Sequence, residues 1–213
     1  MAFLETLEER IEFIVDTSYC ILCNKIANGD ITIPNEASMQ LHLGTIMKQL
    51  GVLFEYSSED RFRIEMESVQ HIQPTQKSKS GTARCDIKLV LSEGKKKCEA
   101  FVELKYLKKS ENKSSTEAVT DNRYSVYCDI QNLENYNEKN KNCQCYEIVY
   151  TDNINHTLIK DTKYCIGNDY TLKAGKYENT KDRFVEINND YLFKWNIYKE
   201  DKEDKCFLKI KVR

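Results

Sequence analysis

The sequence lacks long hydrophobic runs, and this excludes a membrane-spanning helix. Such a helix needs about 20 consecutive apolar residues, and no stretch of the 213 residues approaches that length. The first residues carry Glu5, Glu8, Glu9 and Glu12, where a secretory signal would carry basic residues followed by an apolar segment. We therefore expect a soluble, cytoplasmic protein that needs no membrane and is long enough for a substantial core.

Histidines and glycine-rich loops are also scarce, which limits the chemistry that the chain can perform. The three histidines, His42, His71 and His156, are scattered, so they do not favour a hydrolase built on histidine. A glycine-rich phosphate-binding loop is missing, so ATP dependence is not expected. The sequence also lacks an internal repeat and a clear domain boundary, and we expect a single domain over 1–213.

Cysteine is more frequent, with nine residues. An odd number of cysteines without an export signal favours reduced thiols over disulfides. Cys20 with Cys23, and Cys143 with Cys145, leave a zinc site as one hypothesis. No histidine lies near either pair and the second spacing does not suit a zinc knuckle, so packing of Cys20 and Cys23 as small hydrophobic residues on a helix is favoured.

Charge is distributed unevenly along the chain. The whole chain has a net charge of −2, whereas residues 77–113 contain 11 Lys/Arg against 5 Asp/Glu, a net of +6. A local positive stretch of this kind attracts polyanions even on an acidic protein. A lysine-rich hairpin that is merely solvated is the alternative.

Hydrophobic periodicity and turn residues predict an alternation of helices and strands. Helices are expected over 3–27, from the N-cap Asn35 to about Leu50, and over 123–138. Strands are expected over 62–69, 83–91, 98–107 and 146–151, with further strands within 184–212. Residues 108–122 are polar and predict a loop.

Asp86 and Glu103 are expected to face each other across a β-hairpin. Their positions are symmetric about a turn at Gly94 and Lys95, so a regular hairpin pairs them directly. Paired residues have Cβ atoms about 4.5–5.5 Å apart on one face of the sheet, and Lys105 shares that face because it is two residues further on. Two carboxylates at that distance repel each other, and a hard divalent cation such as Mg²⁺ relieves the repulsion.

This set of side chains suits phosphodiester hydrolysis. A bound metal polarises a phosphoryl oxygen and lowers the pKa of an attacking water, and Lys105 would orient that water or stabilise the developing charge. Glu36 lies on the apolar stripe of the second helix and is expected to face inward; its partner is either a metal site or its own helix N-terminus. We interpret Asp129 as a solvated helix residue, with a contact across the site or a dimer as the alternative.

These residues resemble a known signature. Arg84-Cys85-Asp86, followed after sixteen intervening residues by Glu103-Leu104-Lys105, is similar to the motif of the PD-(D/E)xK nucleases, with Cys85 in place of the proline. The resemblance covers residues 30–151. It implies an α/β fold with a central mixed β-sheet flanked by helices, and Mg²⁺ or Mn²⁺ as cofactor. It also implies metal ligation by Asp86, Glu103, Glu36 and the Leu104 carbonyl, with Lys105 acting on the water.

The resemblance predicts a Mg²⁺-dependent endonuclease that cuts double-stranded DNA, in the manner of a type II restriction enzyme. Cutting both strands with one site per chain suggests a homodimer, and residues 152–213 would supply sequence recognition or dimer contacts. Two alternatives stay open. One is a DNA repair nuclease or junction resolvase of the same fold, and the other is a non-catalytic nucleic-acid-binding module.

Overall fold

The computed structural model describes residues 4–75, 78–108, 116–160, 163–178, 184–199 and 204–213. Its centre is a six-stranded sheet in the order β1-β2-β3-β4-β10-β9. Strands β3 and β4 are parallel, and the other neighbours are antiparallel. The bounds are β1 (Asp60–His71), β2 (Thr82–Glu93), β3 (Lys96–Leu107), β4 (Cys143–Thr151), β9 (Trp195–Lys199) and β10 (Asp204–Val212).

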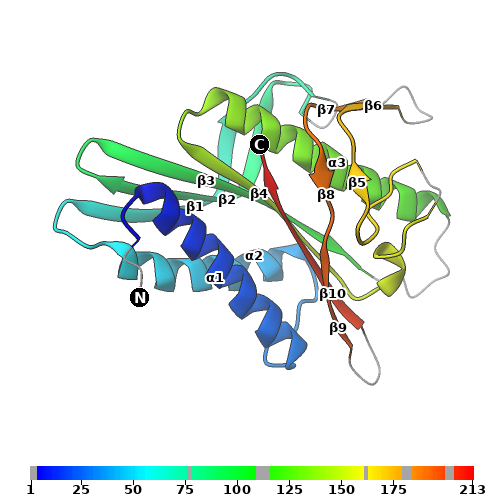
Figure 1. Ribbon diagram of the computed structural model, residues 1–213, viewed down its shortest axis with the longest axis horizontal. Coiled ribbons are helices and arrows are strands. Elements are labelled where there is room, and N and C mark those ends of the chain that lie inside the picture. The colour runs from blue at the N-terminus through cyan, green and yellow to red at the C-terminus, as the bar shows by residue number, and fades with distance from the viewer. Residues whose placement is uncertain (1–3, 76–77, 109–115, 161–162, 179–183, 200–203) are drawn as a thin grey trace.

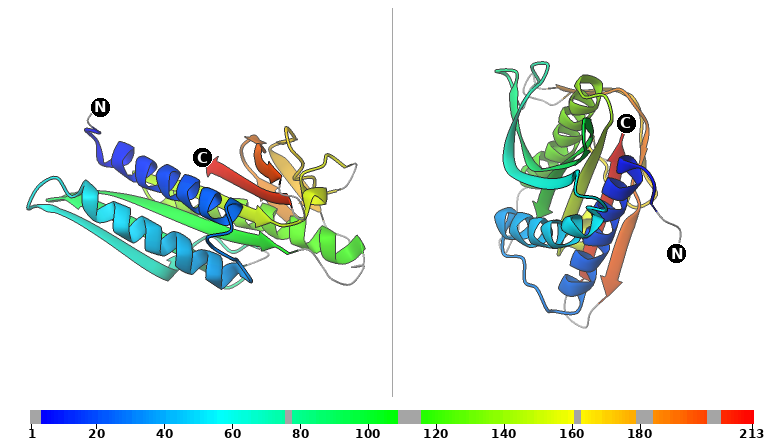
Figure 2. Two further views of the ribbon diagram at one scale, coloured as in Figure 1. Left: turned by 90° about the horizontal axis from the view of Figure 1, so that it is seen from below. Right: turned by 90° about the vertical axis from the view of Figure 1, so that its left-hand side faces the viewer.

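Three helices cover the two faces of this sheet (Figures 1 and 2). Helices α1 (Leu7–Ala27) and α2 (Glu36–Gly51) lie together on one face, and α3 (Thr116–Lys139) lies on the other. The fold class predicted from the sequence, a mixed sheet flanked by helices, is confirmed. In the part of the chain that the structure describes, no helix is long and apolar enough to span a membrane.

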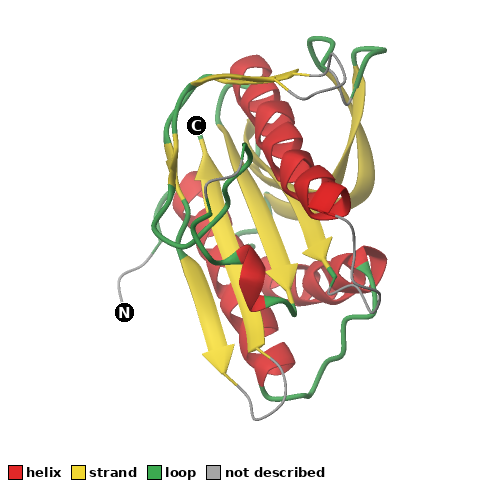
Figure 3. Cartoon of the chain, turned by 90° about the vertical axis from the view of Figure 1, so that its right-hand side faces the viewer, coloured by secondary structure: helices red, strands yellow, loops and turns green. Residues whose placement is uncertain are grey.

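Shorter elements complete the molecule, and among them the small sheets lie on the α3 side (Figure 3). Two small two-stranded sheets pair β5 with β8 and β6 with β7, and two 3-10 turns follow α2 and β4. Their bounds are η1 (Val52–Phe54), η2 (Ile154–His156), β5 (Thr171–Leu172), β6 (Gly175–Glu178), β7 (Phe184–Ile187) and β8 (Tyr191–Leu192). Residues after 152 therefore divide between these small sheets and the edge of the main sheet, where β10 pairs with β4.

The first two helices begin where capping side chains direct them. Helix α1 starts at Leu7 rather than at residue 3, because Thr6 and Glu9 form a capping box: Thr6 Oγ1 accepts from the Glu9 N–H (3.1 Å) and the Glu9 carboxylate accepts from the Thr6 N–H (3.0 Å). Asn35 caps α2 as predicted, and its Oδ1 accepts from the Ser38 N–H (2.9 Å).

The predicted loop over 108–122 is wrong for its second half. Helix α3 begins at Thr116, whereas residues 109–115 lie outside the described residues. Apolar periodicity identifies only helical turns that bury a face, and the first turns of α3 are polar. Glu117 and Ala118 are good helix formers, so a helix there needs no apolar stripe.

Two hydrophobic cores fill the space on either side of the sheet. One joins α1 and α2 to the sheet and is mainly aliphatic, with Tyr19, Tyr146, Tyr150 and Phe207 as its buried aromatic members; its aliphatic members include Ile11, Ile14, Leu22, Met39, Leu43, Met47, Leu89 and Leu104. The other joins α3 to the sheet and is richer in aromatic residues, including Phe101, Tyr127, Tyr136, Tyr164, Phe193 and Trp195.

Strands β2 and β3 separate at Asp86. The predicted hairpin register is confirmed from Glu93 opposite Lys96 to Ile87 opposite Val102, where this ladder ends, so the expected direct pairing of Asp86 with Glu103 is wrong. Beyond it β3 continues with β4, and β2 continues with β1. Ile87 packs into the α1–α2 core whereas Cys85 packs into the α3 core, so β2 changes face at the residue between them. We call this separation the fork.

Candidate functional site

Asp86 occupies the first position of β2 outside its ladder with β3. Its Oδ2 accepts a hydrogen bond from the Leu104 backbone N–H, at 2.7 Å. Leu104 lies beyond the last residue of β3 that pairs with β2, so the carboxylate supplies the acceptor that the strand no longer offers. The fork thus fixes the Asp86 carboxylate against the backbone of the strand that carries Glu103 and Lys105.

Lys105 links both helical layers at the fork. Its Nζ lies 3.2 Å from Glu36 Oε2 on α2 and 3.5 Å from Asp129 Oδ2 on α3. The Lys105 side chain is 18% exposed. Because carboxylates from opposite faces of the sheet contact the ammonium group, its position is defined by the tertiary structure and not by β3 alone.

Glu36 does not face into the core as the helical stripe predicted. Its side chain is 42% exposed, and it reaches from the first turn of α2 to β3. There its Oε2 accepts from the Tyr106 N–H (3.1 Å), in addition to the contact with Lys105. The sequence left the partner of Glu36 open between a metal site and its own helix N-terminus, and the structure instead shows it on the backbone and the lysine of β3.

Glu103 points to the α3 face and is buried, with 2% of its surface exposed. Its Oε1 accepts from the Tyr136 hydroxyl on α3, at 2.9 Å. The parallel register places Glu147 of β4 beside Glu103, and Glu147 is fully buried. Two adjacent strands therefore carry buried acids at the same level of the sheet.

The expectation that Asp129 is a solvated helix residue is wrong. Asp129 has no exposed surface, and it contacts Lys105. The physical reason is its helical position, since Val126, Leu133 and Tyr136 lie three residues before it and four and seven after it, and all three are buried. This spacing places Asp129 on the buried stripe of α3, so the sequence contained a signal for its burial.

The sequence did not single out Gln40, whose side chain binds both β1 and β2 at the fork. Gln40 Nε2 donates to the Asp86 carbonyl oxygen (2.7 Å) and to Glu67 Oε1 (3.0 Å). Glu67 has a φ of 53°, a left-handed conformation that is uncommon for a residue other than glycine and costs of order 1–3 kcal/mol. Gln40 lies one turn after Glu36 on α2, so the two side chains share a helix face.

Tyr106 is a second residue that the sequence did not single out. Its hydroxyl donates to Asp152 Oδ2, at 2.9 Å, and its ring stacks on Tyr150 with centroids 5.0 Å apart. These contacts tie the end of β3 to the end of β4. Asp152 thereby adds another acid on the side of the site where the two parallel strands end.

Negative charge predominates at the fork. Glu36 and Asp129 contact the Lys105 ammonium group, and Asp86 lies close enough to feel the charges of all three. Burial raises the pKa of Asp86 to about 6; the charges of Asp129 and Glu36 add to this effect, while the Leu104 N–H and Lys105 oppose it. An excess of carboxylates in a partly desolvated site favours uptake of a cation or of protons.

The donor chemistry at the fork suits a hard cation. Within the described residues, no three His, Cys, Asp or Glu side chains are grouped as a metal centre. Mg²⁺ is usually held by one or two carboxylates and keeps several waters, so it needs fewer protein ligands than such a centre provides. The cysteines are all free thiols, with Cys23 buried on α1 and Cys20 exposed.

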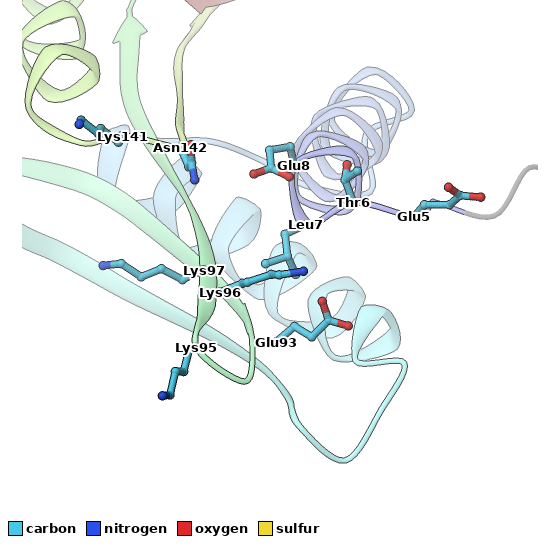
Figure 4. A pocket seen from close by; sticks show the side chains of 10 residues that line it. All are labelled: Glu5, Thr6, Leu7, Glu8, Glu93, Lys95, Lys96, Lys97, Lys141 and Asn142. Carbon is cyan, nitrogen blue, oxygen red and sulfur yellow. The ribbon is translucent and has the colours of Figure 1, made fainter.

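A cavity lies at the opposite end of the sheet (Figure 4). It has a volume of about 470 Å³ and lies between the β2–β3 turn and the start of α1. Its lining includes Lys95, Lys96 and Lys97 from the hairpin, with Glu8 from α1. The fork residues are not among the described residues that line it, so the turn lysines and the acids of the fork belong to separate regions.

The fork therefore combines clustered carboxylates, a positioned lysine and a strained backbone residue at the end of the sheet where β3 and β4 finish. Such a group can bind a cation and can place an ammonium group beside it. Comparison with protein-family models, with curated proteins and with solved structures finds no match to this chain.

Proposed function

We propose that this protein is a Mg²⁺-dependent endonuclease that hydrolyses phosphodiester bonds in double-stranded DNA, with Mn²⁺ able to replace Mg²⁺. The observation that supports this most directly is the position of Lys105, which is held by Glu36 and Asp129 beside the Asp86 carboxylate. A polyanionic substrate can approach this acidic site only with a cation present. The similarity of the Asp86 and Glu103-Leu104-Lys105 segments to the PD-(D/E)xK signature supports the same function.

Each side chain has a separate role in this proposal. Asp86 and Glu103, with the Leu104 carbonyl and support from Glu36, would hold the metal. The metal would polarise the phosphoryl oxygen and lower the pKa of the attacking water. Lys105 orients that water and stabilises negative charge that develops on the phosphate.

The surrounding contacts keep these groups in place. The Leu104 N–H orients Asp86, and the Tyr136 hydroxyl orients Glu103. The carboxylates of Glu36 and Asp129 hold the ammonium group of Lys105 in position. Groups held in this way lose little freedom on reaching the transition state, which is how preorganised sites accelerate reactions.

We further propose a type II restriction role and a homodimer, because the chain is small and one site per chain cuts only one strand at a time. A repair nuclease or junction resolvase would use the same site on branched DNA. A non-catalytic binding module would retain the acids without turnover. The preferred DNA substrate and the presence of turnover therefore distinguish the restriction enzyme, the repair nuclease or resolvase, and the binding module.

The experiment compares supercoiled plasmid, genomic DNA and a four-way junction with and without Mg²⁺. Wild type is tested beside Glu103→Gln and the matched control Glu99→Gln. Glu99 lies on the same strand and is also buried, but it pairs with Lys88 and Lys97 (both 3.1 Å) away from the fork. We expect discrete fragments with wild type and Glu99→Gln only in Mg²⁺, and none with Glu103→Gln.

Other outcomes separate the rivals. Cleavage confined to the junction would replace the restriction role with a resolvase role. Absence of turnover on every substrate, in both Mg²⁺ and Mn²⁺, would contradict the proposal and favour the binding module.

A further inference from the structure

Strand β1 forms one edge of the main sheet and is twelve residues long. An edge strand presents backbone N–H and C=O groups that can pair with another strand, and monomeric proteins usually shorten or obstruct such edges. The backbone N–H of Phe62 points away from β2, toward the open edge, because it donates to Glu55 Oε1 (2.6 Å). By alternation, the backbone groups of Ile64 and Met66 also point outward.

The charges along this edge are self-complementary. Arg63, Ile64 and Glu65 are consecutive, and both charged residues are exposed on the same face of the strand. If a second copy of the strand pairs antiparallel about Ile64, Arg63 faces the partner's Glu65, and Glu65 faces the partner's Arg63. Phe62 then lies opposite the partner's Met66, and the two isoleucines lie opposite each other.

Neighbouring registers keep part of this complementarity, since Arg61 would face Glu65 or Arg63 would face Glu67, but each also opposes two like charges. Centring the pair on residue 63 sets two arginines against each other, and centring it on residue 65 sets two glutamates against each other. Directly opposed like charges destabilise an antiparallel pair. The register centred on Ile64 also joins residues whose backbone groups point outward, so it satisfies hydrogen bonding and charge together.

We propose that β1 pairs with β1 of a second copy of this chain, antiparallel and centred on Ile64, to form a two-fold symmetric dimer with one continuous sheet. Such an interface uses the same surface on both subunits and is a case of strand addition at a sheet edge. The Glu55 carboxylate moves away from the Phe62 N–H when the outer ladder bonds form, whereas the central bonds at Ile64 need no such change.

Helix α2 enlarges this surface. It packs closely over β1, since a Cβ placed on Gly44 would lie 2.8 Å from Met66 Cε. Symmetric pairing of the strands therefore brings the two α2 helices toward the dimer axis. Leu41 on α2 is 64% exposed, and Met66 and Val69 on β1 are 42% and 54% exposed, so apolar surface is available beside the strand pair, which a stable interface requires.

Glu36, Asp86, Glu103 and Lys105 take no part in this dimer surface, so its failure would remove the proposed homodimer and leave the proposed nuclease site untouched. A two-fold axis normal to the sheet also leaves both forks on the same face of the joined sheet. Two active sites on one face could act on one duplex, which deepens the proposed function where that function holds.

The test is sedimentation equilibrium of the full chain without DNA. Wild type is expected to reach twice the chain mass of 25.0 kDa as its concentration rises. Arg63→Glu and Glu65→Arg each replace two attractive pairs with two repulsive ones, and each is expected to raise the dimer dissociation constant by about 30-fold. The control is Lys199→Glu, a charge reversal on β9 at the opposite edge, which should dimerise as wild type does.

The decisive measurement is an equal mixture of the two single variants. In a heterodimer of Arg63→Glu with Glu65→Arg, both opposed pairs are again oppositely charged, so the mixture should recover the wild-type dissociation constant. Thermal unfolding by circular dichroism confirms that each variant is folded. A monomeric wild type at every concentration, single variants that dimerise like wild type, or a mixture that stays monomeric would each overturn the proposal.

Discussion

The two faces of the central sheet differ in what they bury. The α1–α2 face is filled with aliphatic side chains such as Ile14 and Leu43. The α3 side buries the carboxylates of Glu103, Asp129, Glu134 and Glu147, each no more than 2% exposed, whereas the buried acid beside α1 is Asp60, which pairs with Arg10. Burial of a carboxylate opposes folding unless it is paired, and these acids have partners, such as the Tyr136 hydroxyl for Glu103 and Lys105 for Asp129. Acids held in fixed positions beside the sheet are what the proposed metal site requires, while the α1–α2 core holds the sheet in place.

The largest expected effect comes from removing an acid of the fork. Asp86→Ala should lower the rate of DNA cleavage by at least about a thousandfold, because metal polarisation contributes several kcal/mol to such reactions. Its free energy of unfolding should not fall, since the desolvation that raises the Asp86 pKa also opposes folding. Single-turnover cleavage and urea unfolding measure the two quantities. A wild-type rate would show that Asp86 lies outside the active site.

On the α1–α2 face we expect the opposite result, a loss of stability without a loss of cleavage. Leu43→Ala should lower the free energy of unfolding by about 2–5 kcal/mol, because Leu43 is fully buried and its truncation leaves a cavity. Cleavage per folded molecule should stay unchanged. The control is Leu41→Ala on the same helix, where the side chain is 64% exposed and little change in stability is expected. A decrease of specific activity in Leu43→Ala would remove the distinction between the two faces.

Replacing Lys105 is expected to affect both cleavage and stability. Lys105→Met should slow cleavage about 100-fold and destabilise the protein, because the buried Asp129 carboxylate loses a cationic partner. Adding Asp129→Asn should recover stability without recovering cleavage. Mg²⁺ affinity, measured by calorimetry, should be retained in Lys105→Met. If that affinity is lost instead, Lys105 acts on the metal site and not on the water.

The pKa of Asp86 predicts a smaller effect that depends on pH. A carboxyl whose folded-state pKa is raised from 3.8 to about 6 binds its proton more tightly in the folded protein, so stability falls as pH rises between these values. Asp86→Asn should therefore be more stable than wild type by roughly 1–3 kcal/mol above pH 6. Below about pH 4 the difference should disappear. Urea unfolding of both proteins across this pH range, without metal, measures the difference in their free energies of unfolding. A difference that stayed constant with pH would show that the pKa of Asp86 is not raised.

The smallest effect concerns lysines at the two ends of the β2–β3 hairpin. Neutralising Lys108, Lys109 and Lys113 should weaken DNA binding and flatten its salt dependence, by about 0.9 in the log–log slope for each phosphate that is no longer neutralised. Lys108 is exposed at the end of β3, and the other two lie outside the described residues. Neutralising Lys95, Lys96 and Lys97, which line the remote cavity, should do less. Binding in Ca²⁺ measures both, and a larger decrease for the turn lysines would reverse this placement of the DNA.

The hairpin and the first two helices follow from local signals. Gly94 at the turn and the alternation of Ile87, Leu89 and Leu91 predict the β2–β3 register, because side-chain direction in a strand has a period of two. Asn35 predicts the start of α2, because its side chain can satisfy a free backbone N–H in the first turn. Both signals act within a few residues, so a single sequence is enough to locate them.

The sequence by itself determined the β2–β3 register as far as Ile87 opposite Val102 and the signature that makes Asp86 and Glu103 candidates. Only the tertiary structure decided that β2 turns away at Asp86, that Glu36 reaches Lys105 across 69 residues of sequence, and that Asp129 is buried beside the same lysine. Side chains separated this far in sequence meet according to how whole helices pack on the sheet, and periodicity constrains only which face each helix presents.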